Sequence, residues 1–260
     1  MKREPLGVIA ARARTHDETR ALRSLLRALD GDPRAGAAAL ADAIGRRLDA
    51  ARRERARLGR LFALRRQLVR GGASHVAGVD EVGVGPLAGP VVAAAVILPA
   101  RISLSGLDDS KRLARATRER LDAAIRAQAV AIGIGEVWPE ELDRLNVYRA
   151  GLEAMRRAVI ALATLPDHVL VDARTIPRIA TPQTALVRGD SRDGSIAAAS
   201  IVAKVHRDAI MLRLERAHPG YGFARHMGYA TREHLHALAR LGPSPMHRRS
   251  FAPCNQLALL

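Results

Sequence analysis

Four carboxylic acids stand at or shortly after the ends of short apolar runs, and this placement could support a shared chemistry. The four are Asp80, Glu81, Asp172 and Asp190. In α/β sheets, functional sites gather just outside the carboxyl ends of strands, so acids from three segments are expected to converge there. Without a counter-charge such a cluster would repel itself and raise its own pKa values. A divalent metal removes that cost, and carboxylate oxygens are the ligands that Mg²⁺ and Mn²⁺ prefer.

The rest of the chain is strongly basic, which suggests a partner for this acidic site. The 260 residues include 42 Lys+Arg against 26 Asp+Glu, so the formal net charge is +16. A basic surface attracts a phosphate backbone, while clustered acids can hold metal ions that activate water and stabilise a leaving oxygen. The combination predicts metal-dependent phosphodiester hydrolysis. For any single acid, a helix cap or a surface ion pair is the simpler alternative.

Composition excludes several other classes of protein. A hydrophobic fraction of 48% is enough to bury a core. The longest apolar run, Val91–Leu98, is too short to span a membrane, and the first residues lack the long apolar stretch of a secretory signal. The lone Cys254 excludes a disulfide framework and a zinc site built on paired cysteines. We therefore expect a soluble, cytoplasmic protein that has no membrane partner.

The elements that must position the acids form an α/β pattern from about residue 73 onward. Three β-compatible runs lie close together, and later ones alternate with helical patterns, which predicts a mixed sheet covered by helices. The predicted strands are 76–79, 91–98, 130–137, 169–171 and 185–187, and the predicted helices are 142–165 and 195–217.

The preceding residues, 1–72, predict a separate basic helical extension, with 73–260 as the second domain. Residues 1–74 hold 18 basic and 8 acidic side chains. Thr15 and Glu18 have the spacing of a capping box, and one helix is expected over Pro33–Arg70. Five arginines cluster along that helix, at Arg52, Arg53, Arg55, Arg57 and Arg60. They form either a solvated helix face or an auxiliary nucleic-acid contact.

Two other motifs could mark a different kind of binding site. Gly83–Ala88 fits a dinucleotide-binding pattern, but Pro86 and Pro90 make an immediate helix improbable there, so no small-molecule cofactor is expected. Four histidines lie near the end of the chain in no standard zinc spacing. We interpret them as surface or phosphate-contacting residues: His226, His234, His236 and His247.

Several motifs in order resemble those of the type 2 ribonuclease H family, specifically bacterial ribonuclease HII. The resemblance begins at Gly78–Val91 and covers about residues 75–253, leaving the N-terminal helices outside. The further matching segments are Asp109–Leu113, Leu170–Asp172, Gly189–Ser191, Ala197–Val205, Tyr221–Phe223 and His247–Phe251.

The resemblance implies a ribonuclease H-like fold and endonucleolytic cleavage of RNA in RNA–DNA hybrids or of ribonucleotides embedded in DNA. Products would carry 3′-hydroxyl and 5′-phosphate ends, and the setting would be ribonucleotide excision repair and DNA replication. The family's metal ligands fall on the same four acids, which would hold two divalent ions, Mg²⁺ or Mn²⁺. A monomer is expected.

Family-like substrate contacts fall on Lys111 at the phosphate backbone and Tyr221 near the scissile ribose, the latter in a C-terminal helical part that binds substrate. For Lys204 the resemblance leaves contact and structural roles open. Phe223 and Phe251 are expected in the core.

One departure affects substrate recognition. The family normally has Gly-Arg-Gly where this chain has Gly83, Val84 and Gly85. In the family this tripeptide reads the ribose 2′-hydroxyl largely through backbone groups, and its arginine contacts phosphate. Valine cannot donate to a phosphate, so altered RNA–DNA junction specificity is expected. The alternative is a catalytically weak or inactive nucleic-acid-binding relative of the same fold.

Overall fold

The chain separates into two units near residue 60. The computed structural model describes residues 4–15 and 19–257, and its contacts divide the chain into Met1–Arg60 and Leu61–Leu260. The boundary predicted from the sequence lies at residue 72. It differs because apolar side chains beyond residue 60, among them Leu64 and Leu68, pack against Val76 in the second unit.

The N-terminal unit consists of helices, as predicted. They are α1 (Leu6–Thr15), α2 (Thr19–Ala28) and α3 (Ala37–Leu61). Apolar side chains at helical spacing form its small core, including Ile9, Leu22, Leu25 and Ile44. The capping box predicted at residues 15–18 lies outside the described side chains.

The helix predicted over residues 33–70 is interrupted at Phe62, after which α4 (Ala63–Arg70) begins. Phe62 is buried, and its ring covers Gly194 so closely that a Cβ there would lie 2.3 Å from the ring. The contact made by this aromatic ring, rather than helix propensity, therefore sets the break.

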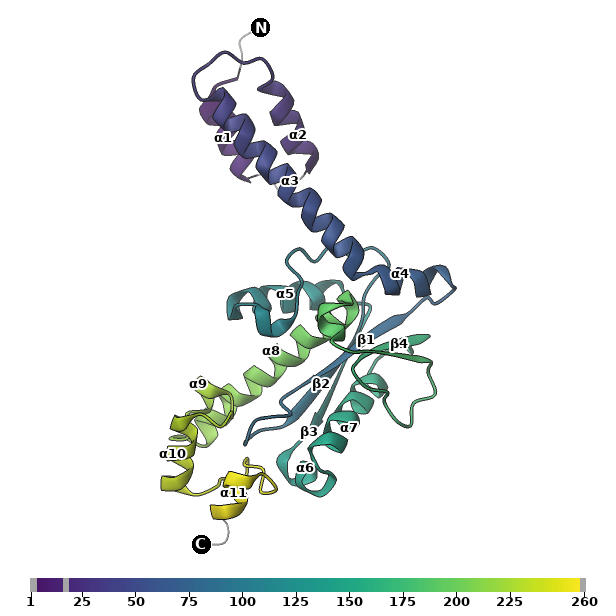
Figure 1. Cartoon of the computed structure of the whole chain (residues 1–260), viewed down its shortest axis with the longest axis vertical. Coiled ribbons are helices and arrows are strands. Elements are labelled where there is room, and N and C mark those ends of the chain that lie inside the picture. The colour runs from purple at the N-terminus through teal and green to yellow at the C-terminus, as the bar shows by residue number, and fades with distance from the viewer. Residues whose placement is uncertain (1–3, 16–18, 258–260) are drawn as a thin grey trace. The chain divides into compact units, whose positions relative to one another are not determined.

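The second unit contains a five-stranded mixed sheet, which confirms the predicted α/β class (Figure 1). The strand order is β3-β2-β1-β4-β5, antiparallel across β3, β2 and β1 and parallel across β1, β4 and β5. The strands are β1 (Val76–Val82), β2 (Val91–Ile97), β3 (Ala131–Val137), β4 (His168–Asp172) and β5 (Gln183–Leu186).

Helices cover both faces of this sheet. On one face α8 (Gly194–Ala217) packs against β1 and β2, and α7 (Val147–Ile160) packs on the other against β2 and β3 (Figure 1). Close approach of α7 requires glycine in β3, because a Cβ at Gly133 or Gly135 would lie 2.0 Å from a carbonyl oxygen of α7.

The helix predicted over 142–165 is two helices, α6 (Pro139–Leu145) and α7. Asn146 adopts a positive φ of 72° between them, and its side chain accepts a hydrogen bond from the N–H of Arg149. Residues other than glycine rarely combine this φ with a ψ of 160°, so the helix ends at Asn146. Its side chain caps the next helix, which starts there.

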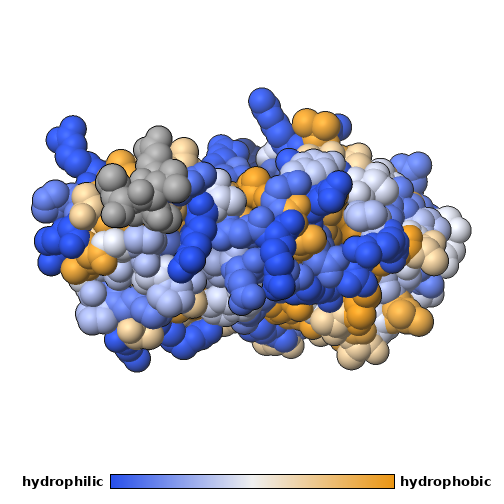
Figure 2. All heavy atoms as spheres, turned by 90° about the horizontal axis from the view of Figure 1, so that it is seen from below, coloured by the Kyte–Doolittle hydropathy of each residue, from blue (hydrophilic) through white to orange (hydrophobic). Residues whose placement is uncertain are grey.

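Shorter elements complete the second unit. They are η1 (Ser110–Arg112), α5 (Arg115–Gln128), η2 (Gly189–Ser191), α9 (Phe223–His226), α10 (Arg232–Leu241) and α11 (Ala252–Leu257). Hydrophilic side chains cover most of the face drawn in Figure 2, with hydrophobic ones in separate patches. Among the described residues, no helix combines the length and hydropathy needed to cross a membrane.

Candidate active site

Asp80 and Glu81 are consecutive residues near the carboxyl end of β1, and they project to opposite faces of the sheet because side chains alternate along a strand. Asp80 is 4% exposed and bonded to Ser200 of α8. Glu81 lies toward α7, since its Cγ is 4.0 Å from where a Cβ at Gly151 would stand. The two carboxylates are adjacent but differently surrounded.

Asp172 and Asp190 complete the acidic site from two further segments. β4 runs parallel to β1 in a register that, continued by one residue, places its last residue, Asp172, beside Asp80. Asp172 Oδ1 accepts a hydrogen bond of 2.6 Å from the N–H of Gly189, which opens η2. The next residue, Asp190, is buried. The structure therefore brings the four sequence-predicted acids to one end of the sheet.

Burial and mutual repulsion raise the pKa of three of these acids. Burial raises the pKa of Asp80 well above its ordinary value, and the negative charge of Glu81 raises it further. The pKa of Glu81 is raised by burial and by Asp172. Burial, followed by repulsion from Asp109, raises the pKa of Asp190. The carboxylates therefore act on one another electrostatically, as expected of closely spaced acids.

The donor chemistry fits a hard divalent cation, although the side chains are not gathered into a ready-made centre. All four candidates are carboxylates, and Glu81 Oε2 is buried with no hydrogen-bond partner. Within residues 4–15 and 19–257, no three His, Cys, Asp or Glu side chains lie close enough together to hold an ion. Asp80 and Glu81 are spread because they project to opposite faces of the sheet, and the side chain of Asp172 is held by the hydrogen bond from the N–H of Gly189. Metal binding would require these carboxylates to turn toward one another.

Lys111 is placed at this site, next to the acids. Its Nζ lies 3.6 Å from Asp190 Oδ2, and its side chain is 77% exposed. Its short helix η1 is capped by Asp109, and Ser110 Oγ lies 2.9 Å from Ser200 Oγ, the hydroxyl that also bonds Asp80. Burial lowers the pKa of Lys111, but the surrounding carboxylates outweigh it and raise the pKa overall. Lys111 therefore stays charged.

The tripeptide Gly83, Val84 and Gly85 follows β1 and is held by two buried arginines. Arg248 donates to the carbonyl oxygens of Gly83 and Val84, and Arg207 donates to carbonyl oxygens farther along the same loop. Both arginine side chains are fully buried. Sequence reasoning missed both, although Arg248 lies inside one of the matching motifs.

Tyr221 lies in an aromatic cluster rather than among the acids. It is 8% exposed, its ring stacks on Phe223 at 5.3 Å, and its hydroxyl donates to the carbonyl oxygen of Gly242 at 2.8 Å. No described hydrogen bond or ion pair joins it to the four acids. Phe223 is fully buried and Phe251 packs against the core, as predicted.

Three of the four histidines interpreted as surface or phosphate-contacting residues are buried, so that interpretation is wrong for His226, His234 and His247. His236 is exposed as expected. The buried three surround the ring of Phe223, His226 and His234 edge-on and His247 tilted. Their spacing along the chain conceals this, because it is not the spacing of one helix face.

The buried histidines form a hydrogen-bond network that requires them to be neutral. His234 Nδ1 donates to Tyr229 O at 2.9 Å, so its Nε2 must accept from His247 Nε2 at 3.0 Å. His247 Nδ1 then accepts from the N–H of Ser244 at 3.0 Å. Burial lowers the pKa of His234, and that of His247 to about 4. In the same cluster, burial lowers the pKa of His226. The network anchors the turn that carries Arg248.

Lys204 is engaged within α8. Its Nζ lies 2.7 Å from Asp208 Oδ1, and the pair is largely buried. This contact supports a structural role, the second of the two that the resemblance left open.

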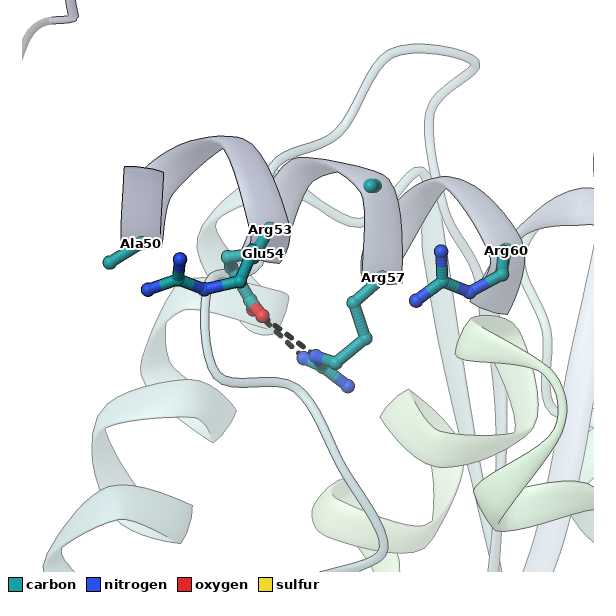
Figure 3. Close-up of a pocket in the computed structure, with 6 residues that line it drawn as sticks. Ala50, Arg53, Glu54, Arg57 and Arg60 are labelled. Atoms are coloured by element: carbon teal, nitrogen blue, oxygen red, sulfur yellow. Dashed lines mark hydrogen bonds and ion pairs between the residues drawn. The ribbon is translucent and has the colours of Figure 1, made fainter. Parts of the chain in front are cut away.

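In the N-terminal unit, α3 carries a shallow basic hollow (Figure 3). Arg53, Arg57 and Arg60 line it, together with Glu54, which forms an ion pair of 2.7 Å with Arg57. Arg53 and Arg60 are exposed. These side chains come from the arginine cluster noted in the sequence.

Comparisons with known proteins agree with this geometry. A family model described as ribonuclease HII matches residues 77–254. A ribonuclease HII of Myxococcus xanthus is 52% identical over 233 residues, covering 89% of this chain and 80% of that protein. One from an Anaeromyxobacter species is 50% identical over 252 residues, covering 96% of this chain and 80% of that protein. The chain belongs to the ribonuclease HII family.

Family membership makes the chain an enzyme of the ribonuclease H class, a nuclease and hydrolase, as predicted. The fold agrees: the structure of ribonuclease H2 from Pyrococcus horikoshii superposes with a TM-score of 0.61 at 24% identity, covering 70% of this chain and 96% of that one. The family model begins at Ala77, so the N-terminal unit lies outside it. The Anaeromyxobacter alignment covers 96% of the chain and therefore extends into that unit.

Proposed function

We propose that the chain is an endonuclease that hydrolyses the RNA strand of RNA–DNA hybrids and ribonucleotides embedded in DNA, leaving 3′-hydroxyl and 5′-phosphate ends. The observation that carries the proposal is the placement of four carboxylates at one end of the sheet, with Asp80 and Asp190 buried, beside Lys111 in a basic chain. Membership of the ribonuclease HII family supports the class of reaction.

Two divalent ions, Mg²⁺ or Mn²⁺, would be held by Asp80, Glu81, Asp172 and Asp190. When bound, they supply a nucleophilic water and stabilise the departing oxygen. Ser200 fixes Asp80 from α8, and the N–H of Gly189 fixes one oxygen of Asp172. Glu81 Oε2 is buried and has no protein partner, so it is the readiest ligand.

The substrate would be bound by residues around the end of the sheet that carries the four acids. Lys111 stays charged next to the acids and is exposed enough to meet a phosphate. Gly83, Val84 and Gly85 would face the ribose through backbone groups, and Val84 would weaken selection of an RNA–DNA junction because it cannot contact phosphate. Tyr221 would contact the ribose through its hydroxyl, which must first give up its hydrogen bond to the carbonyl oxygen of Gly242.

A catalytically weak or inactive binder is the second candidate, favoured by Val84 and by the acids being spread rather than gathered. Four buried or half-buried carboxylates next to a polyanion argue against it, since they weaken binding unless metal is present.

Cleavage of two duplexes tests the proposal, one containing a single ribonucleotide and one a long RNA–DNA hybrid, each with Mg²⁺ and with Mn²⁺. We expect cleavage by the wild type and none above background by Asp80→Asn. Asp42→Asn is the control, because Asp42 is an exposed acid on α3 of the N-terminal unit. Tight binding without cleavage under any metal condition would favour the binder instead.

We also propose a cytoplasmic monomer that acts in ribonucleotide excision repair and DNA replication. Sedimentation at working concentrations tests the monomer.

A further inference from the structure

The loop after β1 is held from inside by a guanidinium group whose described hydrogen bonds all go to backbone oxygens. Arg248 Nη2 donates to the carbonyl oxygen of Gly83 at 2.5 Å, and Nη1 donates to that of Val84 at 2.9 Å. Nε and Nη2 both donate to Gly89, at 3.1 and 2.9 Å. The N–H of Arg248 also donates to Leu87 at 2.8 Å. Arg248 is fully buried. A planar, forked donor therefore fixes several peptide groups of one loop.

These contacts determine which way the next two amides point. The described chain has no cis peptide bond, and in a trans peptide the carbonyl oxygen and the following N–H point in opposite directions. Since the oxygens of Gly83 and Val84 face Arg248, the N–H groups of Val84 and Gly85 face away from it. Neither amide donates a hydrogen bond to another described residue. Two adjacent donors are left open on the outer side of the loop.

The positive charge behind these amides is offset only from a distance, by Asp143 acting on Arg248 and Asp208 acting on Arg207. A second buried arginine, Arg207, donates to the carbonyl oxygens of Pro90 at 2.9 Å and Ala88 at 3.1 Å. Neither Arg207 nor Arg248 forms an ion pair with a carboxylate in the described ranges. Consecutive backbone N–H groups with positive charge behind them favour an electron-rich oxygen in front. The loop leaves β1 two residues after Glu81, so that oxygen would belong to the molecule bound at the acids.

We propose that Arg248 is a positioning residue, which aims the N–H groups of Val84 and Gly85 at an acceptor oxygen of the substrate's sugar–phosphate backbone. This proposal rests on the proposed function only in taking nucleic acid as the bound molecule. The acceptor is either a phosphate oxygen or the ribose 2′-hydroxyl, and the two can be told apart by binding.

Binding of two duplexes in EDTA tests the proposal without any need for cleavage. One is a DNA duplex with a single ribonucleotide, and the other is the same duplex entirely of DNA. The variants are Arg248→Lys, which keeps the charge but loses the fork, and Arg65→Lys. The second is the matched control, because Arg65 is also a buried arginine that donates to two backbone carbonyl oxygens, but those of Leu98 and Pro99, outside this loop.

We expect Arg248→Lys to raise Kd about 10-fold, as two misdirected hydrogen bonds predict, and Arg65→Lys to change it less than 2-fold. If phosphate is the acceptor, binding of both duplexes weakens equally. If the 2′-hydroxyl is the acceptor, only binding of the ribonucleotide duplex weakens. Wild-type affinity in Arg248→Lys, or an equal loss in Arg65→Lys, would overturn the proposal.

Amide hydrogen exchange on the wild-type chain provides a second test in case Arg248→Lys does not fold. The amides of Val84 and Gly85 should exchange freely in the unbound protein and become protected when the duplex binds. Protection before binding, or none after it, contradicts the proposed role. A wild type that binds in this way but cuts neither duplex with metal would overturn the nuclease function and leave the positioning role intact.

Discussion

Charged side chains on α3 of the N-terminal unit stand in solvent, whereas several charged groups of the C-terminal unit are buried in its core. Arg53 and Arg60 are exposed on α3, while Arg248, Arg207 and Asp80 have at most 4% of their surface exposed. An exposed guanidinium keeps its hydration and is screened by salt. A buried one must satisfy its donors with protein atoms and so fixes the backbone around it. The same residue type therefore acts through its net charge in one unit and through its directed hydrogen bonds in the other.

The sharpest test of this contrast compares a buried and an exposed acid. We expect Asp80→Asn to lower kcat by more than about 100-fold, since loss of even a supporting metal contact costs 10–100-fold. Asp42→Asn, at an exposed position on α3, should leave kcat unchanged. Steady-state kinetics with saturating Mg²⁺ measures both. Comparable losses in the two variants would show that burial does not separate the roles of these acids.

Next in size is the pH dependence of stability that the buried histidines impose. His247 has a pKa of about 4 in the folded chain against about 6.5 unfolded. The unfolded chain therefore binds the proton first, and the stabilisation present above pH 6.5 is lost as the pH falls toward 4. The loss is about 2–3 kcal/mol for this side chain.

Denaturant unfolding at pH 7 and pH 4.5 measures this effect. His247→Asn should flatten the pH dependence, and His236→Asn, at an exposed position, should not. An unchanged slope in His247→Asn would mean that the neutral network does not control acid unfolding.

A smaller effect is expected from adding a charge in front of the loop. Val84→Arg should raise kcat/KM on a duplex with one ribonucleotide by several-fold, because a charge-assisted bond to phosphate is worth about 1.5–3 kcal/mol before screening. On a long RNA–DNA hybrid the gain should be smaller. Equal gains on both substrates would show that Val84 does not determine junction specificity.

The smallest effects belong to α3. Arg53→Ala with Arg60→Ala should change the free energy of unfolding by less than about 0.5 kcal/mol, as is usual for exposed positions. Salt dependence of duplex binding then separates the two interpretations of this face: a slope shallower by about two charges indicates phosphate contact, and an unchanged slope a solvated face. Marked destabilisation would contradict the exposed placement.

Much of the second unit followed from sequence pattern. β1 begins at Val76 and α8 ends at Ala217, as predicted, because apolar runs bounded by glycine and proline have few alternatives. The interruptions of the helices at Phe62 and Asn146 could not be predicted from sequence pattern. One depends on an aromatic ring that covers a glycine far along the chain, and the other on a positive φ that a helical pattern does not reveal.

The candidate site likewise contains residues that the sequence predicts and residues that it does not. The location of the four acids could be predicted because the ends of neighbouring strands lie close together in a sheet. The location of Lys111 could be predicted from its motif. The buried histidines and the role of Arg248 could not, since their partners lie up to 165 residues away.

The sequence by itself determined the composition of the site: carboxylates at strand ends, a basic chain around them, and valine where the ribonuclease HII family normally has arginine. Only the tertiary structure decided which charges are buried and what they hold. The reason is physical: a guanidinium acquires direction only when folding removes water and leaves particular carbonyl oxygens as its acceptors, as it does for Arg248 beneath Gly83 and Val84.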